Sequence, residues 1–178
     1  MGPGTASVSI SGLTEGIAYR LGGCCHPIPG DRIIGLMIPG EGCVIHTSDC
    51  EVLDRHQDSM ADWIDVHWKD QAGALGVARI MVRLKNEPGA LAIFANITGQ
   101  NGANISNLKI TSRNTLYFEF QVDVEVRDAG HLENLIRALK VDAAIEAAER
   151  MRGLDTDHQE RDSYGEVQPG LPFEHTKH

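Results

Sequence analysis

The chain has 178 residues, of which 42% are hydrophobic, and a formal net charge of −9 at pH 7. This length predicts one or two small domains, and the acidic balance argues against a nucleic-acid binder that works through bulk positive charge. No run approaches the roughly 18 apolar residues of a membrane span, and no segment is typical of a signal peptide, so we expect a cytoplasmic protein without a membrane partner. All four cysteines lie between residues 24 and 50, and we expect them to be reduced thiols.

Residues 5–70 predict a small sheet with one helix. Its expected strands are residues 33–38, 43–46 and 63–68, with a Pro-Gly-Glu-Gly turn at 39–42 that makes a hairpin of the first two. Thr47 or Ser48 is expected to cap a short helix that ends at Arg55. The segment is acidic, whereas the next one is close to neutral.

Residues 76–152 follow an expected linker at 69–73 and predict a second domain. The expected elements are a strand at 78–85, a helix from Leu91, strands at 103–111 and 116–124, a helix capped by Asp128, and a strand at 143–150. This βαββαβ order predicts an antiparallel sheet with both helices on one face, so the whole chain is expected to be α+β. Residues 153–178 are acidic and poor in apolar side chains, which predicts a disordered tail.

Three stretches carry a resemblance to known families. NEPGAL at 86–91 and GANISNLKI at 102–110 are similar to the first turn and second strand of an ACT domain, a ferredoxin-like regulatory module. CCHPIPGDRIIGLMIPGEGCVIHTSDC at 24–50 resembles the cysteine-containing, zinc-finger-like domain that precedes ACT in RelA/SpoT proteins. The resemblance covers about residues 5–152. It implies the C-terminal regulatory fragment of a bifunctional (p)ppGpp synthetase/hydrolase of the stringent response, without catalytic domains, so we expect no enzyme activity in this fragment.

The resemblance also implies a structural zinc site formed by Cys24, Cys25, His46 and Cys50. Zinc takes four such ligands in a tetrahedron, but adjacent cysteines tend to point to opposite faces, so the pair needs a sharp bend, for which Pro27 and Pro29 are candidates. The alternative is that small buried thiols fill a core beside the hairpin. Both interpretations stay open. Pro29 and Gly30 predict a turn in which Asp31 caps its own backbone.

The Pro-Gly turn at the start of the first ACT helix predicts an amino-acid site. A helix N-terminus binds a carboxylate well, and Gly89 allows a close approach, with the N–H groups of Ala90 and Leu91 expected to lack intrahelical partners. The expected ligand-binding residues are Asn86, Glu87, Pro88, Gly89, Ala90 and Leu91, completed across a homodimer interface by Asn104 and Ile105. We expect Asn104 and Ile105 to lie beside this turn, as the ACT topology implies.

The expected lining is aliphatic, from Ala90, Leu91, Ile105 and Leu108, with no charge and no large aromatic wall. It predicts a branched-chain amino-acid effector, valine or isoleucine before leucine. The alternative is that Gly89 only opens the helix and Asn104 only serves the backbone at a strand start.

Three functions compete. The first is an amino-acid sensor that controls the absent catalytic domains. The second, implied by the resemblance, is a ribosome- and tRNA-binding module that uses Arg32, Arg55, Arg79, Arg83, Lys85, Lys109 and Arg113. The third is a ligand-free dimerisation and autoinhibition element, for which pairing of ACT sheet edges would suffice.

Overall fold

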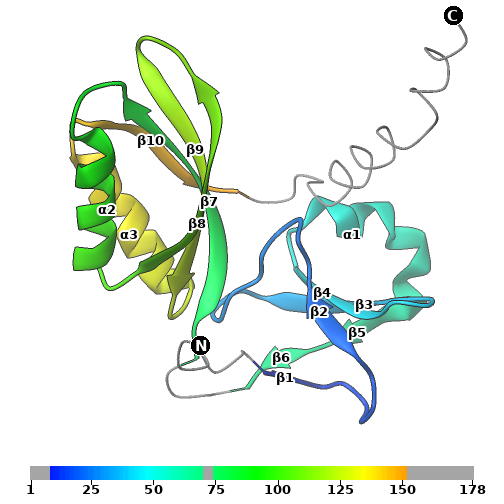
Figure 1. Cartoon of the computed structure of the whole chain (residues 1–178). Helices are drawn as coiled ribbons and strands as arrows, with labels where there is room; N and C mark the ends of the chain where they lie inside the picture. The colour runs from blue at the N-terminus through cyan, green and yellow to red at the C-terminus, as the bar shows by residue number, and fades with distance from the viewer. Residues whose placement is uncertain (1–8, 70–73, 152–178) are drawn as a thin grey trace, which may run out of the picture.

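A computed structural model describes residues 9–69 and 74–151 (Figure 1). Its elements are β1 (Ile10–Ser11), β2 (Tyr19–Leu21), β3 (Ile33–Ile38), β4 (Gly42–Thr47), α1 (Glu51–Arg55), a 3-10 helix (Gln57–Asp62), β5 (Trp63–Asp65), β6 (His67–Trp68), β7 (Gly76–Lys85), α2 (Ala90–Gln100), β8 (Asn104–Arg113), β9 (Tyr117–Val126), α3 (Ala129–Val141) and β10 (Ile145–Arg150). The predicted α+β class is confirmed. The expected tail at 153–178 and most of the expected linker lie outside the described residues. Within those residues, no helix is long and apolar enough to cross a membrane.

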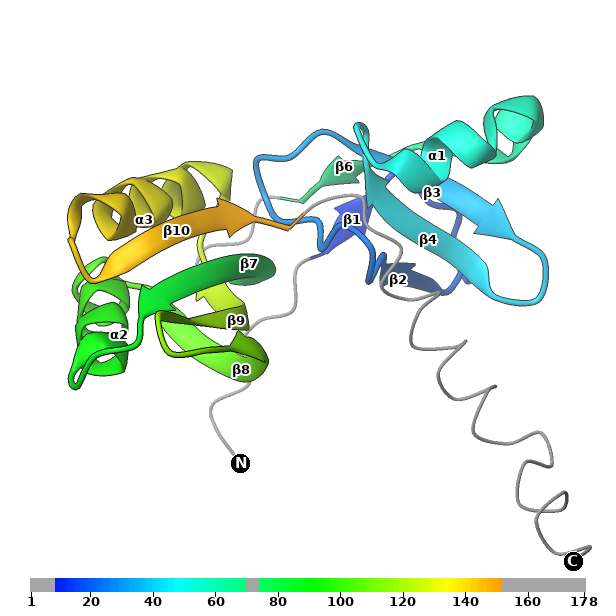
Figure 2. The ribbon, with the colours of Figure 1, turned by 90° about the horizontal axis from the view of Figure 1, so that it is seen from above.

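The second half of the chain forms the predicted βαββαβ unit. Its sheet has the order β10-β7-β9-β8, and every neighbouring pair is antiparallel. Alternate β7 side chains, Ala78, Ile80, Val82 and Leu84, are at most 1% exposed and pack in one core, on the face that α2 and α3 cover (Figure 2). Asp128 caps α3 as expected, because its Oδ1 accepts a hydrogen bond from the His131 N–H at 2.7 Å.

The first half forms a smaller sheet with the order β2-β4-β3-β5. The hairpin of β3 and β4 is confirmed, and its turn closes through a 3.0 Å bond from Glu41 N to Ile38 O. Gly40 supplies the positive φ of 82° that this turn requires. Two strands were not predicted: β2 runs parallel to β4, and β1 pairs with β6.

Two local predictions in this half are wrong. The strand expected at 63–68 is two strands, because β5 pairs with β3 while β6 pairs with β1, and the buried Val66 separates them. The N-cap residue of helix α1 is Cys50 and not Thr47 or Ser48, and no side chain makes a capping hydrogen bond there. Thr47 still belongs to β4, and Cys50 N donates to Thr47 O at 3.0 Å in the turn between strand and helix.

Candidate functional site

One helical turn directs the two adjacent cysteines to the same side. His26 N donates to Gly22 O at 3.0 Å, and His26 adopts a left-handed φ of 46°. Neighbouring residues in such a turn are rotated by about 100°, whereas in a strand they alternate by about 180°. Cys24 and Cys25 therefore converge, and the bend that allows this lies before Pro27 and not at the two prolines.

The four predicted ligands meet in one buried cluster. The Cys24 sulfur lies 3.9 Å from the Cys25 sulfur, 3.5 Å from the Cys50 sulfur and 3.3 Å from His46 Nδ1. The Cys25 sulfur lies 3.8 Å from the same nitrogen, and all four ligand atoms fall within 4.8 Å of one another. Zinc bonds of about 2.3 Å to sulfur and 2.05 Å to nitrogen set tetrahedral separations of about 3.8 Å between sulfurs and about 3.6 Å between sulfur and nitrogen. The donor set and its spacing fit zinc.

The three thiols of this cluster differ in pKa. Hydrogen bonds from Cys24 and Cys25 lower the pKa of Cys50 well below its ordinary value. The hydrogen bonds of Cys24 with Cys25 and Cys50, together with burial, raise the pKa of Cys24. The Cys24 contact lowers the pKa of Cys25, but the Cys50 contact and burial outweigh it and raise that pKa to about 11. The cluster thus holds one favoured thiolate and two thiols that a metal would deprotonate.

Cys43 is separate from the cluster. Its thiol is fully buried in a different core, with Ile10, Ile33, Ile45 and Val66. Burial raises its pKa, which is the behaviour of a packed thiol and not of a reactive one.

The turn that follows the cluster has the predicted structural role. Asp31 N donates to Ile28 O at 3.0 Å, and Gly30 has a φ of 94°, as a type II turn with proline at its second position requires. The Asp31 carboxylate also accepts a hydrogen bond from Ile28 N at 2.8 Å, so it caps its own turn. The sequence did not reveal that the same carboxylate pairs with Arg150.

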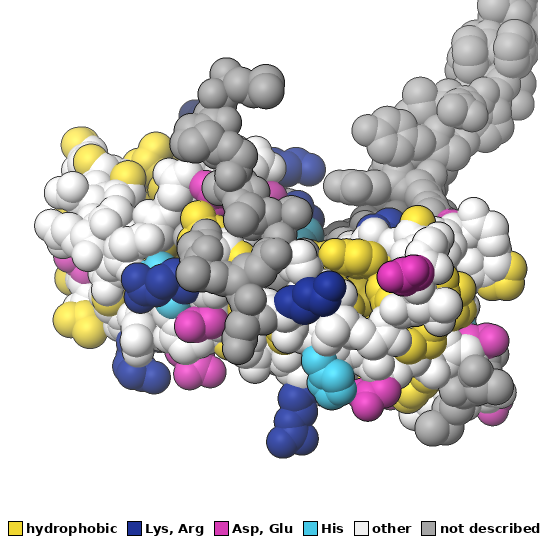
Figure 3. All heavy atoms as spheres, turned by 90° about the horizontal axis from the view of Figure 1, so that it is seen from below, with side chains coloured by type: hydrophobic (Ala, Val, Ile, Leu, Met, Phe, Trp, Pro, Cys, Tyr) yellow, Lys and Arg dark blue, Asp and Glu magenta, His cyan; other side chains and the backbone are white. Residues whose placement is uncertain are grey.

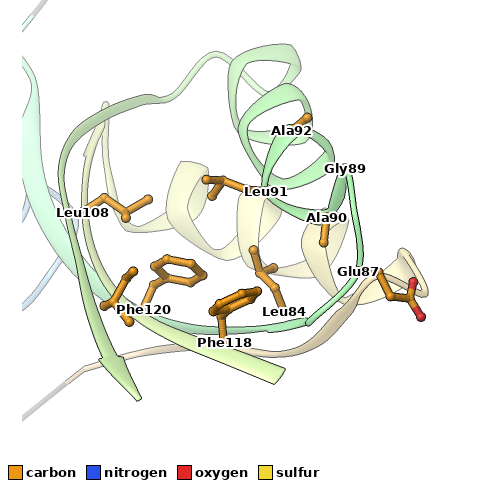
Figure 4. Close-up of a pocket in the computed structure, with 10 residues that line it drawn as sticks. Leu84, Glu87, Gly89, Ala90, Leu91, Ala92, Leu108, Phe118 and Phe120 are labelled. Carbon is orange, nitrogen blue, oxygen red and sulfur yellow. The ribbon is translucent and has the colours of Figure 1, made fainter. Parts of the chain in front are cut away.

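A second candidate site is an apolar cavity of about 430 Å³ beside the first turn of α2 (Figure 4). Its volume is within the usual range of small-molecule sites. Residues of β7, the turn after it, α2, β8 and β9 line it: Leu84, Glu87, Gly89, Ala90, Leu91, Ala92, Leu108, Ile110, Phe118 and Phe120. Figure 4 shows the Glu87 carboxylate directed away from the apolar side chains, so the interior carries no charge.

The polar edge of this cavity is the N-terminus of α2. Gly89 caps the helix in a left-handed conformation, with φ of 85°, and no side chain caps it. Ala90 N has no acceptor within α2, as expected, but it donates to Glu87 O in the preceding turn at 3.3 Å and is therefore not free to bind a ligand. The N–H groups of Leu91 and Ala92 lack intrahelical acceptors at this helix start. A Cβ on Gly89 would meet nothing within 4 Å, which leaves room for a bound group.

The structure brings together only part of the predicted ligand set. Glu87, Gly89, Ala90 and Leu91 line the cavity, as does Leu108. The other two residues of the turn do not line it. Pro88 is absent from the lining, and Asn86 fastens the turn to the next hairpin by donating to Asn114 O at 2.7 Å.

Asn104 and Ile105 lie at the far end of the sheet. Asn104 is opposite Glu125, whereas Lys85, just before the turn, is opposite Tyr117 at the other end of β9. The Asn104 amide donates to the Glu125 carboxylate at 2.5 Å. The expectation that these residues lie beside the turn is therefore wrong within one chain, and they reach the cavity only if a second copy supplies them.

The structure adds an aromatic wall that was not predicted. Phe118 and Phe120 line the cavity with ring centroids 6.1 Å apart, and Leu84 and Ile110 complete the apolar surface. Strand alternation places these side chains on the helix-covered face, together with Leu108. The sequence does not reveal how much of the sheet α2 covers. Ile110 is 52% exposed, so α2 leaves this part of the sheet partly uncovered.

The face of the described residues that Figure 3 shows has no continuous basic patch. In Figure 3, basic side chains lie in separate groups, with acidic ones between them. Two of the proposed nucleic-acid contacts are engaged within the sheet: Arg79 pairs with Asp123 at 2.8 Å, and Arg83 pairs with Glu119 at 2.8 Å. Burial opposes the ionisation of Asp123, but the Arg79 hydrogen bond and charge outweigh it and lower the pKa of that carboxyl.

Comparison with known proteins gives a consistent assignment for both halves. The family model of the RelA/SpoT RIS domain matches residues 8–69, and that of the ACT domain matches residues 77–150. GTP pyrophosphokinase rsh of Brucella ovis is 37% identical over 155 residues, 85% of this chain and 20% of that protein. The bifunctional (p)ppGpp synthase/hydrolase SpoT of Escherichia coli is 29% identical over 127 residues, 71% of this chain and 18% of that protein. This chain thus spans about a fifth of these relatives.

Among solved structures, the ACT domain from GTP pyrophosphokinase of Chlorobium tepidum aligns with a TM-score of 0.37 and 16% identity. The alignment covers 42% of this chain and 95% of that domain.

Proposed function

Because the chain belongs to the RelA/SpoT family, as a C-terminal regulatory region with a RIS and an ACT domain, we propose that it binds an apolar amino acid and allosterically controls catalytic domains that lie elsewhere in the protein. The observation that carries this proposal is the cavity beside α2, where backbone N–H groups border an uncharged, apolar interior. An amino acid with an apolar side chain has the matching polarity, a carboxylate at one end and hydrocarbon at the other.

The carboxylate would accept hydrogen bonds from Leu91 and Ala92. These N–H groups lie at the positive end of the α2 dipole, which favours an anion. The side chain would enter the apolar space between Leu108 and Phe118. Valine or isoleucine is our first choice, because a branched aliphatic side chain needs no polar partner there. Phenylalanine is the ligand to compare with these two, because the aromatic wall of the cavity also suits an aromatic ring.

A second copy of the chain would complete the site. Strand β8 is a sheet edge of ten residues, eight of them exposed, so its outer backbone groups are available for pairing. Antiparallel pairing of two β8 strands about a two-fold axis brings the start of one beside the end of the other. Asn104 of a second copy would then lie near Ile110 and the cavity. This arrangement gives Asn104 the predicted role that it does not have within one chain.

The RIS domain would hold a structural zinc ion with Cys24, Cys25, His46 and Cys50. The support is the fit of the four ligand atoms to tetrahedral spacing and their burial. Zinc bound there would cross-link β4, α1 and the turn before Pro27, and so stabilise a small domain whose core is divided into two clusters. Contact with the ribosome and tRNA stays a prediction.

Isothermal calorimetry against the twenty amino acids tests the sensor function. We expect a saturable heat for valine and isoleucine that Ile110→Glu weakens at least tenfold, because a carboxylate would enter the mouth of the cavity. Leu116→Glu is the matched control, since Leu116 is 75% exposed and does not line the cavity. No heat with any of the twenty would overturn the proposal and favour a ligand-free dimerisation element.

A further inference from the structure

The loop that follows the metal cluster is part of the ACT core. It joins β2 to β3 and reaches the start of β7 (Figures 1 and 2). Ile28 lies in this loop, is fully buried and packs with the ACT side chains and not with either RIS cluster. A Cβ on Gly76 would come within 2.8 Å of Ile28 Cγ2 and 2.9 Å of Pro29 Cδ. Only glycine at the first position of β7 allows this close approach.

Polar contacts fasten the same loop to two ACT elements. Arg150, at the end of β10, donates to Asp31 Oδ2 at 2.7 Å, to Asp31 Oδ1 at 2.9 Å and to His26 O at 3.2 Å. The Arg150 and Asp31 side chains are only 8% and 7% exposed, so water does not replace either partner readily. At the start of α3, Ala129 N donates to Pro29 O at 2.8 Å.

These contacts depend on one loop conformation. Gly30 adopts a φ of 94°, and a Cβ there would lie 3.2 Å from the Ala129 side chain. The Asp31 carboxylate accepts a hydrogen bond from Ile28 N, which caps the turn, and it also forms the ion pair with Arg150. The loop begins directly after Cys25, and the left-handed His26 that ends the cysteine turn also offers its carbonyl to Arg150. The turn that brings the two sulfurs together therefore also positions the loop on the ACT domain.

We propose that the segment Cys24–Asp31 makes the metal cluster and the ACT domain one cooperative unit, so that zinc binding in the RIS domain stabilises the ACT domain, which contributes no ligand. The inference rests on the proposed zinc site. A metal that binds only the native turn stabilises every contact that requires the native turn. Zinc bound at the cluster would thus stabilise the contacts of this segment with β7, α3 and β10.

Amide hydrogen exchange of the whole chain, with zinc and with a chelator, tests this coupling. Zinc content is measured in the same samples. The Ala129 amide is the reporter, because its acceptor is in the RIS loop, and the Asn114 amide is the internal reference, because it bonds to Tyr117 O within the ACT hairpin. We expect zinc to slow exchange of Ala129 at least tenfold relative to Asn114.

Gly76→Ala should remove most of this zinc effect while zinc still binds, because the added methyl group displaces Ile28. Gly99→Ala is the matched control, since a Cβ there meets nothing within 4 Å, and it should keep the effect. Asp31→Asn provides a second test if Gly76→Ala does not fold. Zinc that binds without slowing Ala129 would overturn the coupling, as would a full zinc effect in folded Gly76→Ala or, where that variant does not fold, in Asp31→Asn. No bound zinc would overturn the zinc site itself, and the coupling with it.

Discussion

Arg150 and Asp31 are 119 residues apart in the sequence, yet they form a two-pronged ion pair in which both side chains are more than nine-tenths buried. The pair joins the last strand of the ACT domain to the turn that follows the metal cluster. The guanidinium matches both carboxylate oxygens, a geometry that lysine could not reproduce. This ion pair holds the RIS turn against the ACT sheet.

Removal of the Asp31 charge should be costly. Asp31→Asn leaves the Arg150 guanidinium buried without its counter-charge, and we expect the free energy of unfolding to fall by about 3 kcal/mol. Urea denaturation measures the change. Glu119→Gln is the control, because it breaks a comparable arginine pair whose arginine is 37% exposed, and it should cost less than about 1 kcal/mol. Equal losses in the two variants would contradict the role of the buried pair.

Zinc should bind with one ion per chain. Cys50→Ala removes one of four ligands and should abolish stoichiometric binding after dialysis, as measured by atomic emission. Cys43→Ala should bind zinc like the unchanged chain, because Cys43 lies in a different core. Loss of zinc in both variants, or in neither, would argue against the proposed ligand set.

Zinc binding should release protons. Contacts within the cluster lower the pKa of Cys50, so this thiol ionises most readily, whereas the pKa values of Cys24 and Cys25 are raised and favour their protonated forms. We therefore expect about two protons released per zinc at pH 7.5, and an affinity that falls as the pH is lowered. Calorimetry in buffers of different ionisation enthalpy measures the number. Zinc binding without proton release would show that the thiolates already exist in the metal-free cluster.

Much of the ACT domain could be predicted because its signals are local. The alternation in β7 and β9, the Asp128 cap and the Pro-Gly turn each depend on residues a few positions apart. The failures depend on distant partners. The expected strand at 63–68 divides because its two ends pair with different strands, and the parallel pairing of β2 requires a neighbour more than twenty residues away.

The metal ligands could be predicted from family resemblance, but their convergence could not be derived from spacing. Adjacent cysteines alternate in a strand, and only the turn closed by His26 N and Gly22 O brings them together. The polar edge of the cavity could be predicted, because the Pro-Gly signal for a helix start depends on neighbouring residues in the sequence. Its aromatic wall depends on how far α2 covers Phe118 and Phe120, which is a property of packing.

Asn104 should contribute to ligand binding only in a dimer. Asn104→Ala should weaken valine binding at least tenfold at chain concentrations where sedimentation shows a dimer, since the amide would be supplied by a second copy. Asn96→Ala is the control, because Asn96 is exposed on α2 and does not line the cavity. A dimeric chain that binds valine equally well with and without the Asn104 amide would refute the shared site.

The most direct test of the sensor function is an NMR titration of the ¹⁵N-labelled chain with valine. The account predicts saturable shifts of the Leu91 and Ala92 amides, because these groups would donate to the ligand carboxylate, together with shifts in Ile110 beside the bound side chain. Absence of any shift at these amides under saturating valine and isoleucine, or shifts confined to residues 10–68, would contradict an amino-acid site at the start of α2.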